Sequence, residues 1–458
     1  MSSTDAAVGH VVYKRSPAYA WAVAMGAFFG QLILIFSMKN LYIALSTIAQ
    51  DFGLTSADLA VWASVMGVFY GVAGILWGFL IDKFGCRKVM SVNAFLTAGL
   101  VIAIAAFVYD VAIGCVFMAL LGILFAGADD AVIPKLITTW FHPSKRGLGF
   151  PLVTLGGAIG GVICGILAGN FIEMFGWRGD FYIMGGICVV LAIILTFLIR
   201  DTPASVGTVP FGSPEGTPVE ADEMPKAKTK AEKKASKDLL VRVLKDPATY
   251  KFGLVMIVWY FWFSNYQAYL VAAAQDIGFP VSVAALTTSM ASLGCAVGFF
   301  IWPPLTNRLG RKPIFIFLMA MEGLVTICLY FLFESGITSE VILLGSTLVM
   351  GLFVSSAPVM QNSLGEQFRP SVRGTGSGAA ATISAIGRLA GPMLAAAVIV
   401  AMGSTHSYFL FSGGSAIAAG ILVVFLVKNT GGKYGDPMAE LEAEERRAAL
   451  NEAEKDEG

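Results

Sequence analysis

Charged residues are scarce in this sequence. Asp, Glu, Lys and Arg make up only 14% of its 458 residues, and hydrophobic residues make up 56%, whereas an average soluble domain is about 25% charged. Basic and acidic residues balance at 31 each, so no basic field exists to attract nucleic acid. With a mean hydropathy of +0.74, the chain is predicted to be an integral membrane protein that contacts the lipid bilayer and binds no nucleic acid.

Residue patterns for metal binding and catalysis are also missing. The three histidines lie in a tail and in loops, and the six cysteines form no CxxC pair. Five of the six cysteines fall inside apolar runs, where they act as small buried hydrophobic residues. No nucleophile–base set or nucleotide-binding loop is recognisable. We therefore expect no enzymatic activity, no metal and no cofactor.

What the sequence does contain is a series of long apolar runs. A membrane-spanning helix needs about 20 mostly apolar residues. Twelve such runs are found, at 18–46, 59–81, 89–109, 111–140, 147–172, 179–199, 250–275, 281–304, 313–333, 341–362, 374–402 and 407–428. The first run is too long for the apolar part of a signal peptide, so we expect it to remain as a helix.

Composition divides the chain in the middle. Residues 200–249 are rich in Gly, Pro and Ser and then in Lys, a composition typical of a soluble linker. The prediction is an all-α membrane protein with 12 transmembrane helices in two six-helix bundles. Its parts are a cytoplasmic N-terminal tail (1–17), an N-terminal bundle (18–199), a cytoplasmic linker (200–249), a C-terminal bundle (250–430) and an acidic cytoplasmic tail (431–458).

An internal repeat relates the two bundles. Residues 141–149 match 368–376 at an offset of 227, and residues 82–85 match 307–310 at an offset of 225. The bundles are therefore expected to share one parallel design. Lys and Arg gather in the breaks after even-numbered runs, which places both termini in the cytoplasm. A duplicated bundle with a polar site near the midplane is typical of alternating-access transporters.

One loop motif resembles a known family. Residues 78–88 read Gly-Phe-Leu-Ile-Asp-Lys-Phe-Gly-Cys-Arg-Lys, which is similar to the loop between helices 2 and 3 of the major facilitator superfamily. The resemblance implies a rocker-switch transporter in which this motif latches the cytoplasmic side. The alternative is that its charges serve only topology. The residues predicted to form this cytoplasmic gate are Gly78, Asp82, Lys83, Gly85, Arg87 and Lys88.

Two basic residues inside apolar runs are candidate ligands for an anion. A charge in a membrane span costs about 2.5–3.5 kcal/mol, so it needs a partner or a function. Lys39 and Arg388 are predicted to attract the substrate, and the alternative for each is a structural contact. The polar residues of the seventh run that would complete the pocket are Asn265, Tyr266 and Gln267.

Acidic residues inside the runs are candidate proton carriers. Asp129 and Asp130 lie in the middle of the fourth run, where a desolvated carboxyl can load and release a proton. One of the pair is expected to face the cavity, and the alternative is fixed pairing with Lys135, Lys39 or Arg388. Glu322 falls in a run that the family fold places peripherally, and we expect a structural role for it.

The function predicted from these patterns is secondary active transport in the cytoplasmic (inner) membrane by a functional monomer. The predicted substrate is a small organic anion, most simply a carboxylate, moved with a proton. Lys39-Asn40 is similar to organophosphate exchangers, so an organophosphate or dicarboxylate antiporter without a proton is the alternative. That group of exchangers carries an arginine in its seventh helix, whereas residues 259–267 of the seventh run here contain no cation. This difference counts against the alternative. A membrane sensor that binds a ligand without transporting it is a third hypothesis.

Overall fold

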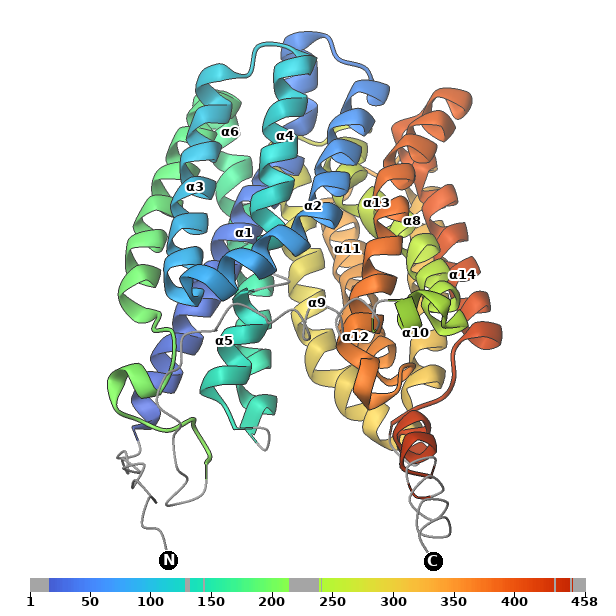
Figure 1. Ribbon diagram of the computed structural model, residues 1–458. Coiled ribbons are helices and arrows are strands. Elements are labelled where there is room, and N and C mark those ends of the chain that lie inside the picture. Colours follow the sequence, from blue (N-terminus) through green and yellow to red (C-terminus); the bar gives the residue numbers. More distant parts are fainter. Residues whose placement is uncertain are drawn as a thin grey trace, which may run out of the picture.

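The computed structural model describes residues 16–127, 132–142, 145–213, 239, 241–431, 434–444 and 447 (Figure 1). Over these residues the named elements are all helices, and one isolated β-bridge joins Phe141 to Phe211. Most of the predicted N-terminal tail, the lysine-rich part of the predicted linker and the end of the predicted acidic tail lie outside the described residues.

Six helices form the first half of the chain: α1 (Pro17–Phe52), α2 (Ser56–Phe84), α3 (Cys86–Phe107), α4 (Val111–Ala126), α5 (Ile133–Trp140) and α6 (Arg146–Leu198). Gly176 interrupts α6 with φ 70° and ψ 169°, a conformation that L side chains rarely adopt. The break separates two arms that match the predicted runs 147–172 and 179–199. Pro17 occupies the first turn of α1, where its missing N–H costs nothing.

The second half repeats this design. After a short 3₁₀ turn, η3 (Ala204–Val206), the helices are α8 (Pro247–Asp276), α9 (Val281–Leu309), α10 (Arg311–Glu334), α11 (Glu340–Val354), α12 (Ser356–Glu366), α13 (Arg373–Met402) and α14 (Tyr408–Leu426). Two further 3₁₀ turns, η4 (Pro370–Val372) and η5 (Thr405–Ser407), precede α13 and α14. The predicted run 341–362 is divided between α11 and α12, at Ser355.

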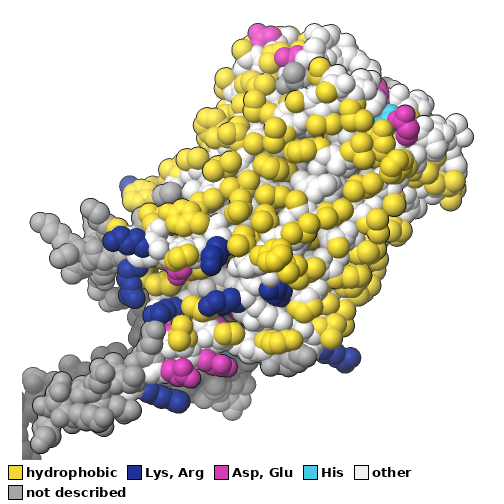
Figure 2. Space-filling view, turned by 90° about the vertical axis from the view of Figure 1, so that its right-hand side faces the viewer, with side chains coloured by type: hydrophobic (Ala, Val, Ile, Leu, Met, Phe, Trp, Pro, Cys, Tyr) yellow, Lys and Arg dark blue, Asp and Glu magenta, His cyan; other side chains and the backbone are white. Residues whose placement is uncertain are grey.

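These helices have the length and the apolar composition that are typical of membrane-spanning helices. Seven of those described are long and apolar enough to cross a bilayer, and three shorter apolar helices accompany them. Figure 2 shows hydrophobic side chains across the middle of one face, with Lys and Arg gathered toward the end where the described chain begins and ends. The described helices thus match the predicted all-α architecture in type, length and composition.

Small residues bring the two halves together along α6 and α9. Gly161, Gly165 and Gly169 follow one stripe of α6 and face α9. A Cβ at Gly165 would lie 2.7 Å from the Ala285 carbonyl oxygen, and Ser289 Oγ donates a hydrogen bond of 2.8 Å to the carbonyl of Val162. Because lipid tails are as apolar as side chains, such close backbone approach is a main source of helix association in membranes.

A second crossing joins α2 to α13. A Cβ at Gly71 would lie 2.5 Å from Ala385 Cβ, and a Cβ at Gly67 would lie 3.0 Å from Arg388 Cβ. Ser64 Oγ donates a hydrogen bond of 2.7 Å to the carbonyl of Leu389. Both crossings lie at mid-height or toward the end opposite the termini (Figure 1). By contrast, α5 packs mainly on α1 and α6, and α12 on α9, α10 and α13. The halves are therefore joined away from the terminal end.

The α6–α9 crossing gives a stability prediction. We expect Gly165→Ala to lower the free energy of unfolding by about 1–3 kcal/mol, because the added methyl group overpacks a backbone contact. The matched control is Gly186→Ala in the other arm of α6, where a Cβ would meet open space. Thermal unfolding of the two purified variants measures the difference. Equal melting temperatures would show that the crossing is loosely packed.

Candidate functional site

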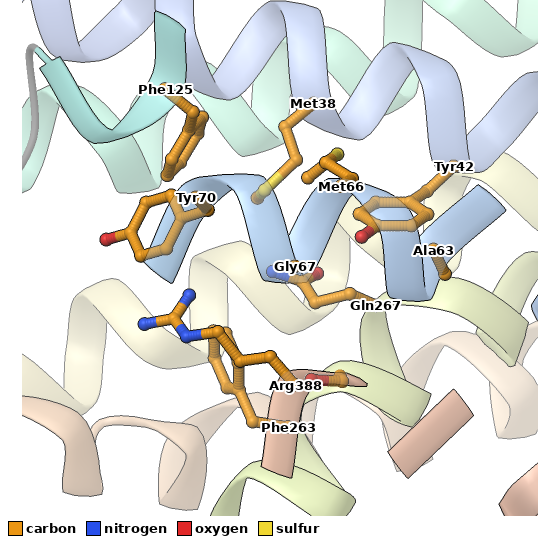
Figure 3. A pocket seen from close by; sticks show the side chains of 11 residues that line it. Met38, Tyr42, Ala63, Met66, Gly67, Tyr70, Phe125, Phe263, Gln267 and Arg388 are labelled. Carbon is orange, nitrogen blue, oxygen red and sulfur yellow. The ribbon is translucent and has the colours of Figure 1, made fainter. Parts of the chain in front are cut away.

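A small cavity lies between the two halves, near the α2–α13 crossing. Its volume is about 40 Å³, which suits a few water molecules and is far below the roughly 300–1,000 Å³ of a ligand pocket. An organic solute therefore requires the halves to move apart. The lining residues come from α1, α2, α4, α8 and α13 (Figure 3): Met38, Tyr42, Ala63, Met66, Gly67, Tyr70, Phe125, Phe263, Ser264, Gln267 and Arg388.

Arg388 is the cation of this cavity. Its guanidinium carbon lies 4.1 Å from the ring centroid of Tyr70, on α2, and 4.0 Å from that of Tyr260, on α8. Arg388 Nη2 also donates a hydrogen bond to the Tyr260 hydroxyl. The guanidinium thus contacts one aromatic ring from each half, an arrangement that offsets part of the cost of its burial.

Glycines on α13 place Arg388 at this point. A Cβ at Gly387 would overlap the carbonyl of Ile257, and a Cβ at Gly391 would lie 3.1 Å from Phe261 Cα. These two glycines let α13 lie directly on α8. Gly67 allows an equally close approach of α2 to α13. The local sequence therefore fixes Arg388 between two helices that belong to different halves.

Lys39 lies outside the cavity lining. Its side chain is only 7% exposed, and Nζ donates a hydrogen bond of 2.8 Å to Ser292 Oγ on α9. The Lys39 stem passes over Gly161, where a Cβ would lie 3.2 Å from its Cε. Lys39 thus joins α1 of the first half to α9 of the second at the α6–α9 crossing. The structure does not bring Lys39 and Arg388 to one cavity.

The polar residues predicted in α8 point in different directions. Gln267 lines the cavity. Asn265 is fully buried, and its Nδ2 donates a hydrogen bond of 3.1 Å to Ser412 Oγ on α14. Tyr266 is buried and stacks on Trp262 with 5.6 Å between ring centroids. Of the three, Gln267 alone is placed beside Arg388. Asp129 and Asp130, the predicted proton carriers, lie outside the described residues.

The predicted gate motif forms a tight joint at the terminal end. Gly85 separates α2 from α3 with φ +83°, and Arg87 N donates a hydrogen bond of 2.8 Å to Asp201 Oδ1. The second half repeats the joint, with Gly310 at φ +87° and Lys312 N bonded to Asn429 Oδ1 at 3.2 Å. This pair of joints extends the internal repeat.

Asp201 and Asn429, the acceptors in these joints, were not predicted from the sequence. The signal was their similar separation in sequence from the two motif copies, 114 residues from Arg87 to Asp201 and 117 residues from Lys312 to Asn429. The other motif residues Gly78, Lys83 and Lys88 lie on α2 and α3, and the side chain of Asp82 is not among those described.

Sequence reasoning also missed the aromatic part of the cavity. Tyr42 and Tyr70 belong to apolar runs in which a single ring carries no functional signal, because most such rings simply pack in a core.

Two carboxyl groups, those of Asp180 and Glu322, are fully buried in the helix bundle. Asp180 belongs to the second arm of α6 and carries no hydrogen bond of normal geometry.

Comparison with known proteins gives one family. The family described as Major Facilitator Superfamily matches residues 27–273 and 253–453. The chain is 25% identical over 269 residues to a probable hexose phosphate transport protein of Chlamydia pneumoniae, a match that covers 58% of this chain and 57% of that protein. It is 22% identical over 439 residues to the hexuronate transporter of Bacillus subtilis, covering 91% of this chain and 97% of that one.

The chain thus spans little more than half the length of the first of these relatives. Among solved structures, a mutant of the nucleoside transporter NupG aligns with a TM-score of 0.67 at 14% identity, and the match covers 89% of this chain and all of that one. At this identity the likeness shows a shared fold.

The sandwich of Arg388 between two rings predicts a difference between two substitutions at Tyr70. Tyr70→Phe keeps a ring face for the guanidinium, whereas Tyr70→Leu removes it. We expect Leu to destabilise the protein by about 0.5–2 kcal/mol more than Phe, measured by thermal unfolding in detergent. Equal effects of the two substitutions would indicate that the ring face contributes nothing.

Proposed function

Because the chain belongs to the major facilitator superfamily, a family of membrane transporters and not of enzymes, we propose that it moves a small organic anion across the cytoplasmic membrane by secondary active transport. The chain is a multi-pass membrane protein. We propose twelve spans in two parallel six-helix bundles, 18–199 and 250–430, joined by the linker 200–249. In this proposal the α4–α5 pair and the α11–α12 pair each make one span, and the two arms of α6 make two.

The observation that carries this proposal is the position of Arg388. A guanidinium in a cavity between the two halves is the group that best pairs with a carboxylate or phosphate, because its fork donates two parallel hydrogen bonds. Gln267, Ser264 and Tyr42 add neutral polar groups to the same lining. Two of the relatives are named for hexose phosphate and hexuronate, and both of those solutes are anions.

The contacts between the halves suggest which end is closed in this conformation. Hydrogen bonds cross the halves from Lys39 to Ser292, and Ser282 Oγ donates to Glu173 Oε1 at 2.7 Å near the end opposite the termini. We propose that this closed end faces outward and that the terminal end faces the cytoplasm, as the positive-inside rule predicts. The structure then corresponds to a contracted, inward-directed state of an alternating-access cycle.

Coupling to a proton belongs to the same proposal. Asp129 or Asp130 remains the predicted carrier in the first half. The rival mechanism is exchange of an organophosphate or dicarboxylate without a proton. In both mechanisms the anion supplies contacts that one conformation lacks, because a ligand shifts a conformational equilibrium only through such differential binding.

Topology is tested by reporter fusions. Green fluorescent protein fused after Gly458 should fluoresce, and alkaline phosphatase fused there should be inactive, because both results require a cytoplasmic C-terminus. The same pair of fusions inserted within 214–238 should behave alike. Active alkaline phosphatase at either site would reverse the proposed orientation.

Transport is tested by counterflow in proteoliposomes, with glucose 6-phosphate and glucuronate as probes and glucose as a neutral control. We expect at least one anion, and not glucose, to exchange. Arg388→Gln should weaken binding by about tenfold or more, because a charge-assisted hydrogen bond is worth about 1.5–3 kcal/mol. Lys39→Gln tests the second predicted cation in the same assay.

The matched control is Arg242→Gln, at an exposed position outside the cavity, which should exchange like the wild type. Glucose exchange with an unaffected Arg388→Gln variant would overturn the anion proposal. Anion binding in a thermal-shift assay without any counterflow would favour the ligand sensor over the transporter.

A further inference from the structure

A carboxyl group lies in the core of the second half, away from the predicted binding residues. Glu322 is in the middle of α10 and its exposed fraction is 0%. Trp259 on α8 donates a hydrogen bond of 3.1 Å from Nε1 to Glu322 Oε2. Ser356, the first residue of α12, interacts with the same carboxyl group. Glu322 thus contacts α8 and α12 together.

Two atoms in this cluster lack a completed hydrogen bond. Glu322 Oε1 and Ser356 Oγ are both buried, and neither has a partner of normal geometry. An ionised carboxylate can only accept hydrogen bonds, whereas a protonated one has an O–H that can donate. A proton on Oε1 would let Glu322 donate to Ser356 Oγ while Oε2 continues to accept from Trp259. One proton on Oε1 therefore satisfies both buried oxygens without leaving a negative charge in the core.

In the part of the chain that the structure describes, the helices around Glu322 place no cation against its carboxyl group. Among the described residues, no ion pair involves Glu322. The titratable group that faces it from α9 is the Cys295 thiol. The charged residues of α8, Lys251 and Asp276, lie at that helix's two ends.

The other helices packed on α10 likewise carry their charges at their ends. Arg308 ends α9, Glu340 begins α11 and Glu366 ends α12, while α14 contains no charged residue. An unpaired carboxylate in such a site costs several kcal/mol, and it takes up a proton instead.

The cluster lies at a break in a helix pair. α11 ends at Val354 and α12 begins at Ser356, with Ser355 at φ −68° and ψ 12° between them. α12 leads to Glu366, which forms an ion pair with Arg311 at the terminal end. A change at Ser356 is therefore positioned to alter how α12 packs on α10 near the proposed cytoplasmic face.

The same cluster is one ring away from the cavity. Trp259 stacks on Phe263 with 5.0 Å between centroids, and Phe263 lines the cavity. Trp259 also contacts Tyr260 edge-on at 4.9 Å, and the Tyr260 hydroxyl accepts from Arg388. A shift of Phe263 as the cavity expands is therefore positioned to displace the Trp259 donor.

We propose that Glu322 is a proton-binding site whose occupancy controls the packing of α12 on α10. With the proton bound, Glu322 Oε1–H donates to Ser356 Oγ and α12 is held in place. On release, the O–H bond breaks and the proton passes to water admitted as α12 separates. The carboxylate then keeps the hydrogen bond from Trp259 Nε1–H and accepts hydrogen bonds from the admitted water, while Ser356 moves away with α12. The coupling of this step to transport rests on the proposed function.

The first test needs no substrate. Infrared spectra of the full-length protein in lipid bilayers at neutral pH should show a protonated carboxylic acid band that disappears in Glu322→Gln. The matched control is Glu334→Gln at the end of the same helix, where the side chain is 59% exposed and contacts His406; it should retain the band. A band unchanged by Glu322→Gln overturns the proposal.

The second test follows α12 directly. Hydrogen exchange of residues 356–366 is compared between wild type and Glu322→Gln at each pH, so that the intrinsic exchange rate cancels. As pH rises, the wild type should lose protection relative to Glu322→Gln, because the Gln amide stays uncharged. If the wild type and Glu322→Gln are equally protected at every pH, protonation of Glu322 does not control the packing of α12.

Transport separates this inference from the proposed function. If wild type moves glucose 6-phosphate or glucuronate, Glu322→Gln should keep exchange but lose accumulation driven by a pH gradient. Normal accumulation in that variant would contradict coupling through Glu322. If wild type moves neither probe, the proposed function fails for these anions, and the two spectroscopic tests still decide whether Glu322 binds a proton.

Discussion

The cost of holding polar groups away from water constrains every part of this structure. A charge buried in a helix bundle is costly, so it is expected to have a specific partner or to face a polar cavity. Arg388 lies between two tyrosine rings, and Lys39 donates to Ser292. Both partners are neutral, and both contacts join the first half to the second. Each of the two basic residues therefore makes a described contact that links the halves.

Close contact between helices is a second consequence of the lipid environment. The bilayer supplies little hydrophobic drive for one apolar helix to bind another, so contact area and backbone approach must supply it. Gly165 and Gly169 on α6 and Gly67 and Gly71 on α2 allow this approach at two crossings. Neither crossing includes α5 or α12, which lie in the terminal half of the molecule. Among the described residues, the terminal ends of the halves share fewer contacts than the crossings do, which fits the proposed rocking of one half against the other.

The sequence predicted the helices well because apolar runs of this length have few other solutions in a membrane. The sequence also placed Gly85 in a loop motif between two apolar runs, and the structure has a glycine with φ +83° between α2 and α3 there; the latch expected of this motif stays a prediction. The cavity was harder to predict. Arg388 stood out as a charge in an apolar run, but Tyr70 and Tyr42 did not, because an aromatic residue in a core carries no sign of what it contacts. Lys39 and Asn265 also stood out as polar residues in apolar runs. The sequence does not show which way each helix is rotated, and the structure places both residues away from the cavity lining.

The two contacts of Arg388 differ in what a rocking motion does to them. Tyr260 is in the same half as Arg388, so that contact persists, whereas Tyr70 is in the other half and must separate. Losing a desolvated cation–π contact costs about 2 kcal/mol. A carboxylate or phosphate that pairs with the guanidinium returns about 1.5–3 kcal/mol. The two terms are of similar size, so in the proposed transport cycle an anion that binds in the cavity offsets the cost of separating Arg388 from Tyr70.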